Sequence, residues 1–362
     1  MASVKRRPDG RWRARYRDPA GKEHARHFDR RVDAEQFLTS VEHSKLTGGY
    51  VDPRAGRVTF AEWAEQWQAA QVWRPSSAAA VETSFRQHVL PRFGARPLAT
   101  IRPSEVQAWI RELSDTLGPA TVKLSYRFFA AAMRAAVTDR VLATSPCVGV
   151  KLPELVRERV IPLELDQVQA LVDAMPERYG GLVVVGAGTG LRQGEAFGLT
   201  VDRVDFLRRT LTVDRQIVTP ARGTPHLAAP KTKASRRSVP LPDVVLDALS
   251  QHLAAFPSDG LVFTNGRGEP IRRSVFSRVW RRAVGASGVP AGTTFHDLRH
   301  HYASLLIRHG ESVKVVQARL GHASAAETLD TYSHLWPDSE DLTRAAVDTV
   351  WRADFSRTEQ RR

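Results

Sequence analysis

The chain has 362 residues, 42% of them hydrophobic and 25% charged, so it is long enough for two or three domains and is neither a disordered tail nor a fibre. Lysine and arginine total 53 against 39 acidic residues, and the net charge of +14 makes nucleic acid the leading class of partner. The single cysteine, Cys147, excludes an internal disulfide and indicates a reducing compartment. Because we find no signal peptide and no apolar run of roughly 20 residues, we expect a cytoplasmic protein that does not contact membranes.

The first segment is strongly basic. Residues 1–31 contain 11 lysines and arginines against 4 acidic residues. Within them, residues 11–17 (RWRARYR) alternate with the period of a strand, and turn signals lie on both sides. A further short strand at 24–28 precedes a helix whose apolar residues recur at helical spacing. We therefore predict that residues 1–50 form a small three-stranded sheet plus a helix that covers one face.

The other face of this predicted sheet carries four arginines. They are Arg11, Arg13, Arg15 and Arg17, whereas Trp12, Ala14 and Tyr16 point to the covered side. Because sheets can enter the grooves of DNA, we predict that these arginines bind DNA. A merely solvated strand face is the alternative.

The second segment, residues 58–146, has the pattern of an all-helical domain of about four helices. Thr59 to Glu62 form a capping box, and Ser104 to Gln107 repeat the same pattern. Apolar residues recur at helical spacing after both, and Gly118-Pro119 open a further helix that runs toward Val137.

One linker, at 48–57, separates the first segment from the second, and another, at 145–159, separates the second from the third; both are rich in glycine, proline or charge. Residues 160–350 are predicted to form a larger mixed domain with helices on both sides of a strand-rich stretch at 204–241. Residues 351–362 have the composition of a solvated tail. The predicted fold class is therefore multidomain, mainly α with an α+β part.

Polar motifs in the third segment are weak signals when each is taken alone. Arg192 and Glu195 have the spacing of an ordinary surface ion pair on a helix. His296 and His300 lie four residues apart, but no third ligand accompanies them, so a metal site is disfavoured. The glycine run at 186–190 lacks the remaining residues of either nucleotide-binding loop.

Taken together, four motifs of the third segment resemble those of the tyrosine recombinase (phage integrase) family. They are residues 191–195 (LRQGE), 296–300 (HDLRH), 320–322 (LGH) and 331–334 (TYSH). The intervals are also typical of the family, because Arg299 lies 299 − 192 = 107 residues after Arg192, and Tyr332 lies 332 − 322 = 10 residues after His322. The resemblance covers nearly the whole chain.

The resemblance implies a site-specific DNA recombinase, an integrase of a phage or integrative element. Residues 1–50 are similar to an arm-type DNA-binding domain, residues 58–146 to a four-helix core-binding domain, and residues 160–350 to the mixed α/β catalytic domain. Such an enzyme cuts and rejoins DNA through a covalent 3′-phosphotyrosyl intermediate, and it uses neither metal nor ATP nor any other cofactor.

The resemblance also assigns roles to single residues. Tyr332 is the nucleophile, and Arg192 and Arg299 bind the phosphate, which suits the bidentate and permanently charged guanidinium. His296 and His322 add hydrogen bonds, and His296 is the expected proton acceptor for Tyr332. Two further roles are a general acid, assigned to Lys231 with Lys233 as the alternative, and a residue that orients the arginines or histidines, assigned to Glu195.

The partners implied are double-stranded DNA with core and arm-type attachment sites, further copies of the chain in a homotetramer on DNA, and an accessory DNA-bending or excision factor. Two functions compete with this interpretation. A sequence-specific DNA-binding protein without strand cleavage would not need Tyr332, and a type I topoisomerase would not need the first segment. A nuclease is disfavoured because the sequence offers no acidic cluster for two metals.

Two stretches depart from the family pattern. Residues 218–229 lengthen the hairpin before Lys231, so the sequence does not settle whether this lysine reaches the active site. After Tyr332 the chain continues through residues 338–351, where a modest apolar stripe predicts docking on a neighbouring protomer.

Overall fold

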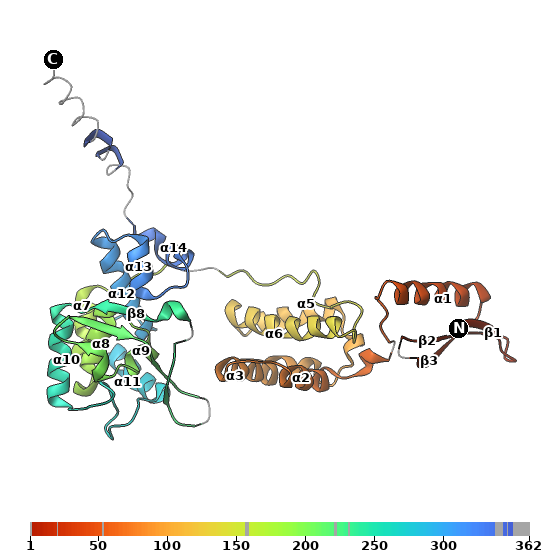
Figure 1. The fold of residues 1–362 in the computed structure, drawn as a ribbon, viewed down its shortest axis with the longest axis horizontal. Coiled ribbons are helices and arrows are strands. Elements are labelled where there is room, and N and C mark those ends of the chain that lie inside the picture. The colour runs from red at the N-terminus through yellow and green to blue at the C-terminus, as the bar shows by residue number, and fades with distance from the viewer. Residues whose placement is uncertain are drawn as a thin grey trace, which may run out of the picture. The chain divides into compact units, whose positions relative to one another are not determined.

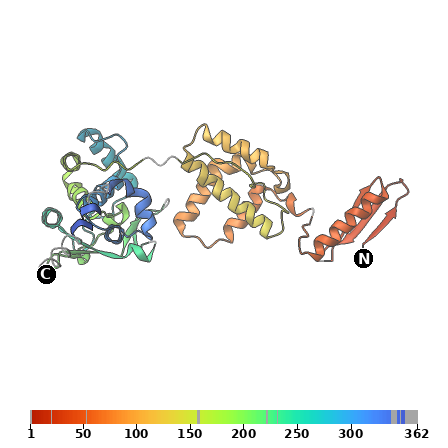
Figure 2. The same cartoon turned by 90° about the horizontal axis from the view of Figure 1, so that it is seen from above.

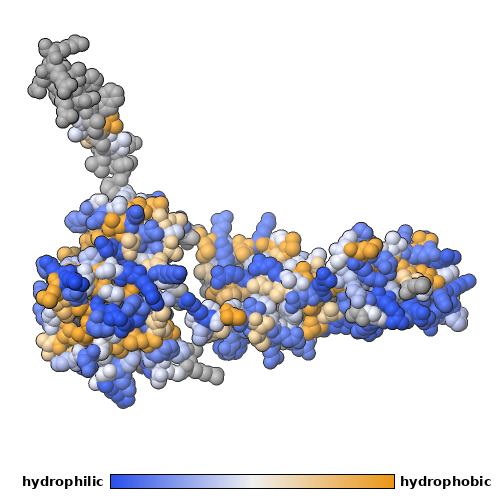
Figure 3. Space-filling model, in the orientation of Figure 1, coloured by the Kyte–Doolittle hydropathy of each residue, from blue (hydrophilic) through white to orange (hydrophobic). Residues whose placement is uncertain are grey.

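The computed structural model describes residues 2–19, 21–52, 54–155, 159–220, 223–230, 232–336, 343–345 and 347–349. The chain divides into two compact units, Met1–Val156 and Arg157–Arg362. Hydrophilic residues cover much of the visible surface of both units (Figure 3). No helix among the described residues is long and apolar enough to cross a membrane.

The first unit begins with the predicted sheet and helix. Strands β1 (Ser3–Arg6), β2 (Trp12–Arg17) and β3 (Glu23–Phe28) are antiparallel in the order β1-β2-β3, and α1 (Arg31–Leu46) lies alongside them (Figures 1 and 2). The alternation along β2 orients its residues as predicted, because Ala14 and Tyr16 are buried against α1. The arginines of β2 therefore point to the opposite face.

The rest of the first unit is helical, and its core is dominated by aromatic side chains such as Phe60, Trp109 and Phe129. The helices are α2 (Phe60–Ala69), α3 (Pro75–Ser84), α4 (Leu90–Phe93), α5 (Pro103–Ser114) and α6 (Pro119–Thr138), and a π-helical turn (Phe85–Val89) joins α3 to α4. Because α3, the turn and α4 are continuous, the segment has the expected four helical rods.

The two predicted capping boxes had different outcomes. The box at Thr59 is confirmed, since the Glu62 amide donates to the Thr59 hydroxyl over 3.3 Å and the Glu62 carboxylate accepts from the Thr59 amide over 2.8 Å. The box at Ser104 is wrong. Helix α5 starts at Pro103, two residues earlier than an N-cap at Ser104 requires, and the carboxylate of Glu105 accepts from the amide of Arg102 over 3.0 Å. Proline at the first helical position shifted the start of this helix.

The second unit contains the predicted strand-rich stretch. Strands β4 (Val204–Asp205), β5 (Thr210–Val213) and β8 (Arg237–Pro240) form one antiparallel sheet in the order β4-β5-β8. A separate hairpin, β6 (Gln216–Val218) with β7 (His226–Ala228), is inserted between β5 and β8. This hairpin accounts for the extra length noted at 218–229.

Helices pack around α8 (Glu177–Thr189), which contacts α7 (Leu165–Ala174), α10 (Asp243–Ala255) and α12 (Phe295–Arg308) (Figure 1). The remaining helices are α9 (Gln193–Phe197), α11 (Arg273–Ser287), α13 (Val313–Leu320) and α14 (Ala325–Tyr332). The glycine run of α8 serves this packing, because a Cβ at Gly186 would lie 2.8 Å from Leu298 and 2.9 Å from Phe295 of α12.

Candidate active site

Arg192 and Glu195 lie at the start of α9, and together they close its first turn. Arg192 precedes the helix, and its backbone amide donates to the Glu195 carboxylate over 2.9 Å. The guanidinium of Arg192 donates to the same carboxylate over 3.1 Å and to the Gly321 carbonyl over 3.3 Å. The Glu195 side chain is 3% exposed, whereas Arg192 keeps 36% of its side chain open to solvent. The pair is therefore not an ordinary surface ion pair.

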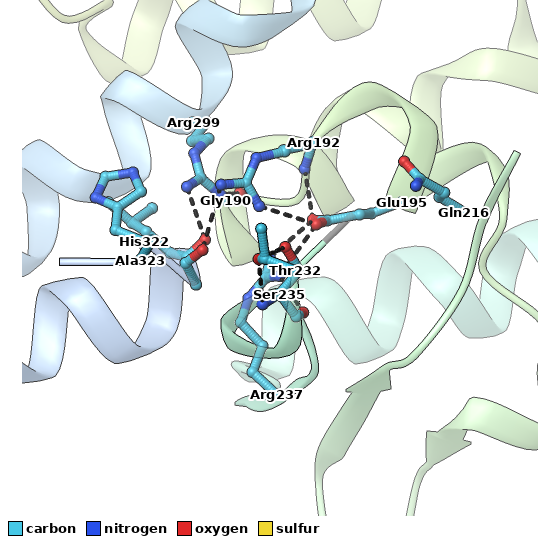
Figure 4. Close-up of polar contacts among 12 residues, drawn as sticks. Gly190, Arg192, Glu195, Gln216, Thr232, Ser235, Arg237, Arg299, His322 and Ala323 are labelled. Carbon is cyan, nitrogen blue, oxygen red and sulfur yellow. Dashed lines mark hydrogen bonds and ion pairs between the residues drawn. The ribbon is translucent and has the colours of Figure 1, made fainter. Parts of the chain in front are cut away.

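Arg237, on β8, is the second partner of Glu195, and sequence reasoning missed it. Its guanidinium donates to both oxygens of the Glu195 carboxylate over 3.2 and 2.9 Å (Figure 4). It also donates to the Arg319 carbonyl over 2.7 Å. Burial on its own raises the pKa of Glu195, but the hydrogen bonds and charge of Arg237 and Arg192 hold that pKa below its ordinary value. Glu195 thus orients arginines, and no contact of it with a histidine is seen among the described residues.

Arg299 of α12 is buried beneath this region. It is 1% exposed, and it donates to the Gly190 carbonyl over 2.8 Å and to the Leu320 carbonyl over 2.7 Å. Those two carbonyls lie at the ends of α8 and α13, so the side chain holds two helix ends together. Since Arg192 binds the carbonyl of Gly321, the residue after Leu320, the two guanidiniums lie next to each other (Figure 4).

The segment that follows β7 packs against the end of α13. Thr232 and Ser235 share a hydrogen bond of 2.9 Å between their hydroxyls, and the Ala234 carbonyl would lie 2.9 Å from a Cβ at Gly321. Lys231, the predicted general acid, falls outside the described residues. The alternative, Lys233, is exposed and begins a short 3-10 turn, Lys233–Ser235.

His322 lies immediately beyond the end of α13 and is buried. Its Nδ1 is 2.8 Å from the hydroxyl of Thr328, and its ring stacks at 6.4 Å on the ring of Tyr332, with 10° between the planes. Burial, followed by the charge of Arg299, lowers the pKa of His322 to about 4. The imidazole is therefore neutral near neutral pH.

Tyr332 ends α14, and its phenol is buried. The hydroxyl oxygen lies 2.8 Å from Nδ1 of His300, a residue to which the family resemblance gave no role. Burial raises the pKa of Tyr332 to about 12, although the charges of Arg299 and Arg192 oppose this rise. A signal for His300 did exist in the sequence, because its spacing of four residues from His296 places both on one side of α12.

His296, the expected proton acceptor, contacts His300 instead. The two rings are perpendicular, with centroids 4.7 Å apart. Burial among its neighbours, then the charges of His300 and Arg299, lower the pKa of His296 to about 4, although the side chain keeps an exposed side. The second unit therefore brings Arg192, Arg299, His322 and Tyr332 together, and it adds Arg237 and His300 to them.

The arginines of β2 belong to the first unit. Arg15 and Arg17 of β2 lie 3.3 and 3.6 Å from Glu23, and Arg11, which immediately precedes β2, lies 3.0 Å from Asp29. These pairs are exposed, so each adds little to stability and their charges stay available to a ligand.

Three family models match successive parts of the chain. The phage integrase family model matches residues 162–338, the phage integrase N-terminal domain matches residues 2–48, and the phage integrase N-terminal SAM-like domain matches residues 59–114. The chain belongs to the phage integrase family. It is an enzyme, a site-specific recombinase of the tyrosine type, and the family predicted from the four motifs is confirmed.

Curated relatives of this integrase match it over most of its length. A putative prophage phiRv2 integrase of Mycobacterium tuberculosis is 27% identical over 340 residues, which cover 90% of this chain and 89% of the relative. A XerC-like tyrosine recombinase of Caldanaerobacter subterraneus is 26% identical over 309 residues, which cover 76% of this chain and 78% of the relative.

Solved structures of other integrases share the fold. The Tn1549 transposon integrase in complex with transposon right end DNA has a TM-score of 0.68 at 20% identity, and the match covers 81% of this chain and 99% of that one. A lambda integrase tetramer bound to a Holliday junction has a TM-score of 0.60 at 20% identity, and the match covers 90% and 96% of the two chains. The predicted fold class is confirmed.

Proposed function

We propose that this integrase cuts and rejoins double-stranded DNA through a covalent bond between Tyr332 and a 3′-phosphate. The observation that carries the proposal is the setting of the buried Tyr332 phenol, whose ring stacks at 6.4 Å on His322, the residue that follows the Leu320 and Gly321 carbonyls bound by Arg299 and Arg192. The charges of both arginines also oppose the rise in the pKa of Tyr332. A tyrosine with only a packing role would gain nothing from two fixed cations. A nucleophile that attacks a phosphodiester needs them.

The arginines supply the charge that the reaction requires. Attack by Tyr332 forms a phosphorane with extra negative charge on the non-bridging oxygens, and fixed cations stabilise that charge without reorganising. Arg192 is the group placed to contact the phosphate, because its side chain is partly open to solvent while Glu195 and Gly321 hold its guanidinium. Arg299 adds a second, buried positive charge and holds the carbonyls of Gly190 and Leu320 in place.

The 5′-oxygen must be protonated as it leaves. We assign this step to Lys231, with Lys233 as the alternative. Support comes from the neighbouring segment, since Thr232 to Ser235 packs against Gly321, whose carbonyl binds Arg192.

The segments before the catalytic domain recognise the DNA sites. We propose that residues 1–50 bind arm-type sites through the β2 arginines, that residues 58–146 bind the core site and that residues 160–350 carry out catalysis. The names of the solved relatives, which include complexes with DNA and a tetramer on a Holliday junction, support double-stranded DNA as substrate and a homotetramer as the active assembly. An accessory DNA-bending or excision factor, and action at the nucleoid, complete this proposal.

The test is the covalent intermediate. Wild-type protein and Tyr332→Phe are expressed in cells that carry the native element, protein-linked DNA is isolated under denaturing conditions, and the ends of the linked DNA are sequenced. We expect sharp 3′ ends at one or two loci with the wild type and none with the variant. If the wild type binds DNA but no Tyr332-dependent linkage forms, the protein is a DNA-binding protein without strand cleavage.

A further inference from the structure

A histidine without an assigned role lies against the nucleophile. Nδ1 of His300 is 2.8 Å from the phenol oxygen of Tyr332, and the two residues come from different helices, α12 and α14. Within the part of the chain that the structure describes, this is the one hydrogen bond of the Tyr332 hydroxyl. The distance is short enough for direct proton transfer.

We propose that His300 is the catalytic residue that accepts the proton of Tyr332 during DNA cleavage and returns it during religation. The proposal rests on the proposed function, since it requires Tyr332 to be the nucleophile. It replaces His296, which the family resemblance favoured for this step.

The other two histidines of the site are less suited to the task. His322 directs Nδ1 to the Thr328 hydroxyl, and it meets Tyr332 by stacking at 6.4 Å between ring centroids. His296 meets the edge of His300 with a centroid distance of 4.7 Å. His296 is therefore placed beside the acceptor and not at the phenol.

The charge state of His300 fits an acceptor. Burial, opposed by Asp297 and assisted by Arg299, lowers the pKa of His300 below its ordinary value, so the ring is neutral near neutral pH. A neutral imidazole has one nitrogen without a proton. In the tautomer that carries its proton on Nε2, Nδ1 of His300 can accept the phenol proton.

The proton balance closes over one cycle. As the Tyr332 oxygen bonds to phosphorus, its proton moves to Nδ1 of His300, the bond from phosphorus to the 5′-oxygen breaks, and that oxygen takes a proton from the lysine general acid. In religation a 5′-hydroxyl attacks the phosphotyrosine and gives its proton to the now neutral lysine, and the departing phenolate takes its proton back from His300. No oxidant, reductant or further reactant is needed.

The first test separates basicity from positioning. His300→Asn keeps a side-chain amide near the position of Nδ1, so it can still hydrogen-bond to Tyr332 but cannot take its proton. On a nicked half-site duplex with the core sequence recovered from the linked DNA ends, we expect the variant to form covalent product about 10²-fold more slowly, at unchanged DNA affinity. Cleavage by His300→Asn at the wild-type rate would overturn the proposal.

A second test asks whether a more acidic phenol compensates for the loss of the base, with His296→Asn as the matched control. Replacing Tyr332 with 3-fluorotyrosine makes the phenol more acidic, so it should need less help from a base. We expect this replacement to restore cleavage more in the His300→Asn background than in the wild type, and His296→Asn to show no such rescue. Rescue confined to the His296 variant, or a loss in His300→Asn that fluorination leaves unchanged, contradicts the proposal.

These experiments distinguish a failure of the proposed strand cleavage by Tyr332 from a failure of the proposed role of His300. If wild-type protein forms no Tyr332-dependent product on the duplex, the proposed function itself fails. If the wild type forms that product and only the His300 results deviate, strand cleavage by Tyr332 stands and the assignment of the acceptor is wrong.

Discussion

Arg237 and Glu195 form a buried ion pair across 42 residues of sequence, with side chains 5% and 3% exposed. The carboxylate lies between Arg237 on one side and Arg192 on the other. Because Arg237 is anchored to the Arg319 carbonyl, the position of Arg192 depends on β8 and on the end of α13 as well as on its own helix.

Removing Arg237 should destabilise the second unit strongly. Arg237→Met leaves a buried carboxylate with one partner fewer, and breaking such a pair costs about 3–5 kcal/mol. We expect the double variant Arg237→Met/Glu195→Gln to recover part of that loss, since it removes the uncompensated charge. Hydrogen exchange of peptides from α8 and α9 in increasing urea measures the unfolding free energy of the single and double variants. If the losses from Arg237→Met and Glu195→Gln simply added in the double variant, the two residues would not be coupled.

Gly321 is expected to tolerate no side chain. Its φ is +64° and a Cβ would lie 2.9 Å from the Ala234 carbonyl, whereas Gly310, with φ of +82°, has nothing within 4 Å. Gly310→Ala should therefore cost only the left-handed strain of about 1–2 kcal/mol. Gly321→Ala should also displace Thr232–Ser235 and slow cleavage by about 10²-fold. Covalent product formation measures this, and equal rates for the two variants would count against the packing role of Gly321.

Stability of the second unit should fall on mild acidification. The pKa values of His296 and His322 are about 4 in the folded protein, against about 6.5 in an unfolded chain. Between these two pKa values the unfolded state binds more protons than the folded state. The stability that the two neutral histidines contribute is therefore complete above about pH 6.5 and is lost as the pH falls toward about 4.

Urea unfolding of the second unit at several pH values measures this dependence. His322→Gln should flatten the slope between pH 6.5 and pH 4, because glutamine does not titrate. His309→Gln, which changes an exposed histidine at the end of α12, serves as the control and should leave the slope unchanged. A slope that His322→Gln does not alter would be inconsistent with a neutral buried His322.

The arginine face of β2 should determine the salt dependence of arm-site binding. Replacing Arg13 and Arg15 with glutamine should lower the slope of log K against log salt by about 0.9 for each lost phosphate contact. Arg26→Gln is the matched control, since Arg26 stacks on Phe28 and Phe37 at the covered side of the sheet. Core-site binding should survive all three changes, and an unchanged slope for the double variant would refute the assignment.

The segment after Tyr332 should act between protomers. The apolar stripe predicted at residues 338–351 includes Leu342, Ala346 and Val350, which lie outside the described residues, and Ala345. Deleting residues 338–362 is expected to reduce recombination more than it reduces binding to one half-site, because docking on a neighbour matters only in the assembled complex. Gel-shift and recombination assays on the same DNA compare the two, and an equal loss in both would argue against this role.

The sequence by itself determined the elements and the family. The alternation of β2, the capping box at Thr59 and the helical apolar periods are local patterns, and local sterics and hydrogen bonds settle them within a few residues. The four motifs likewise singled out Arg192, His296, Arg299, His322 and Tyr332 as candidate site residues, because their spacing along the chain is itself the signal.

Only the tertiary structure decided which groups touch. His300 lies 32 residues from Tyr332, and Arg237 lies 42 residues from Glu195, yet both pairs are in hydrogen-bond contact. Those contacts depend on how α12, α14 and β8 each pack against α13. That packing is set by the shape of the whole core and by the burial of charges that must find partners. No local pattern carries that information.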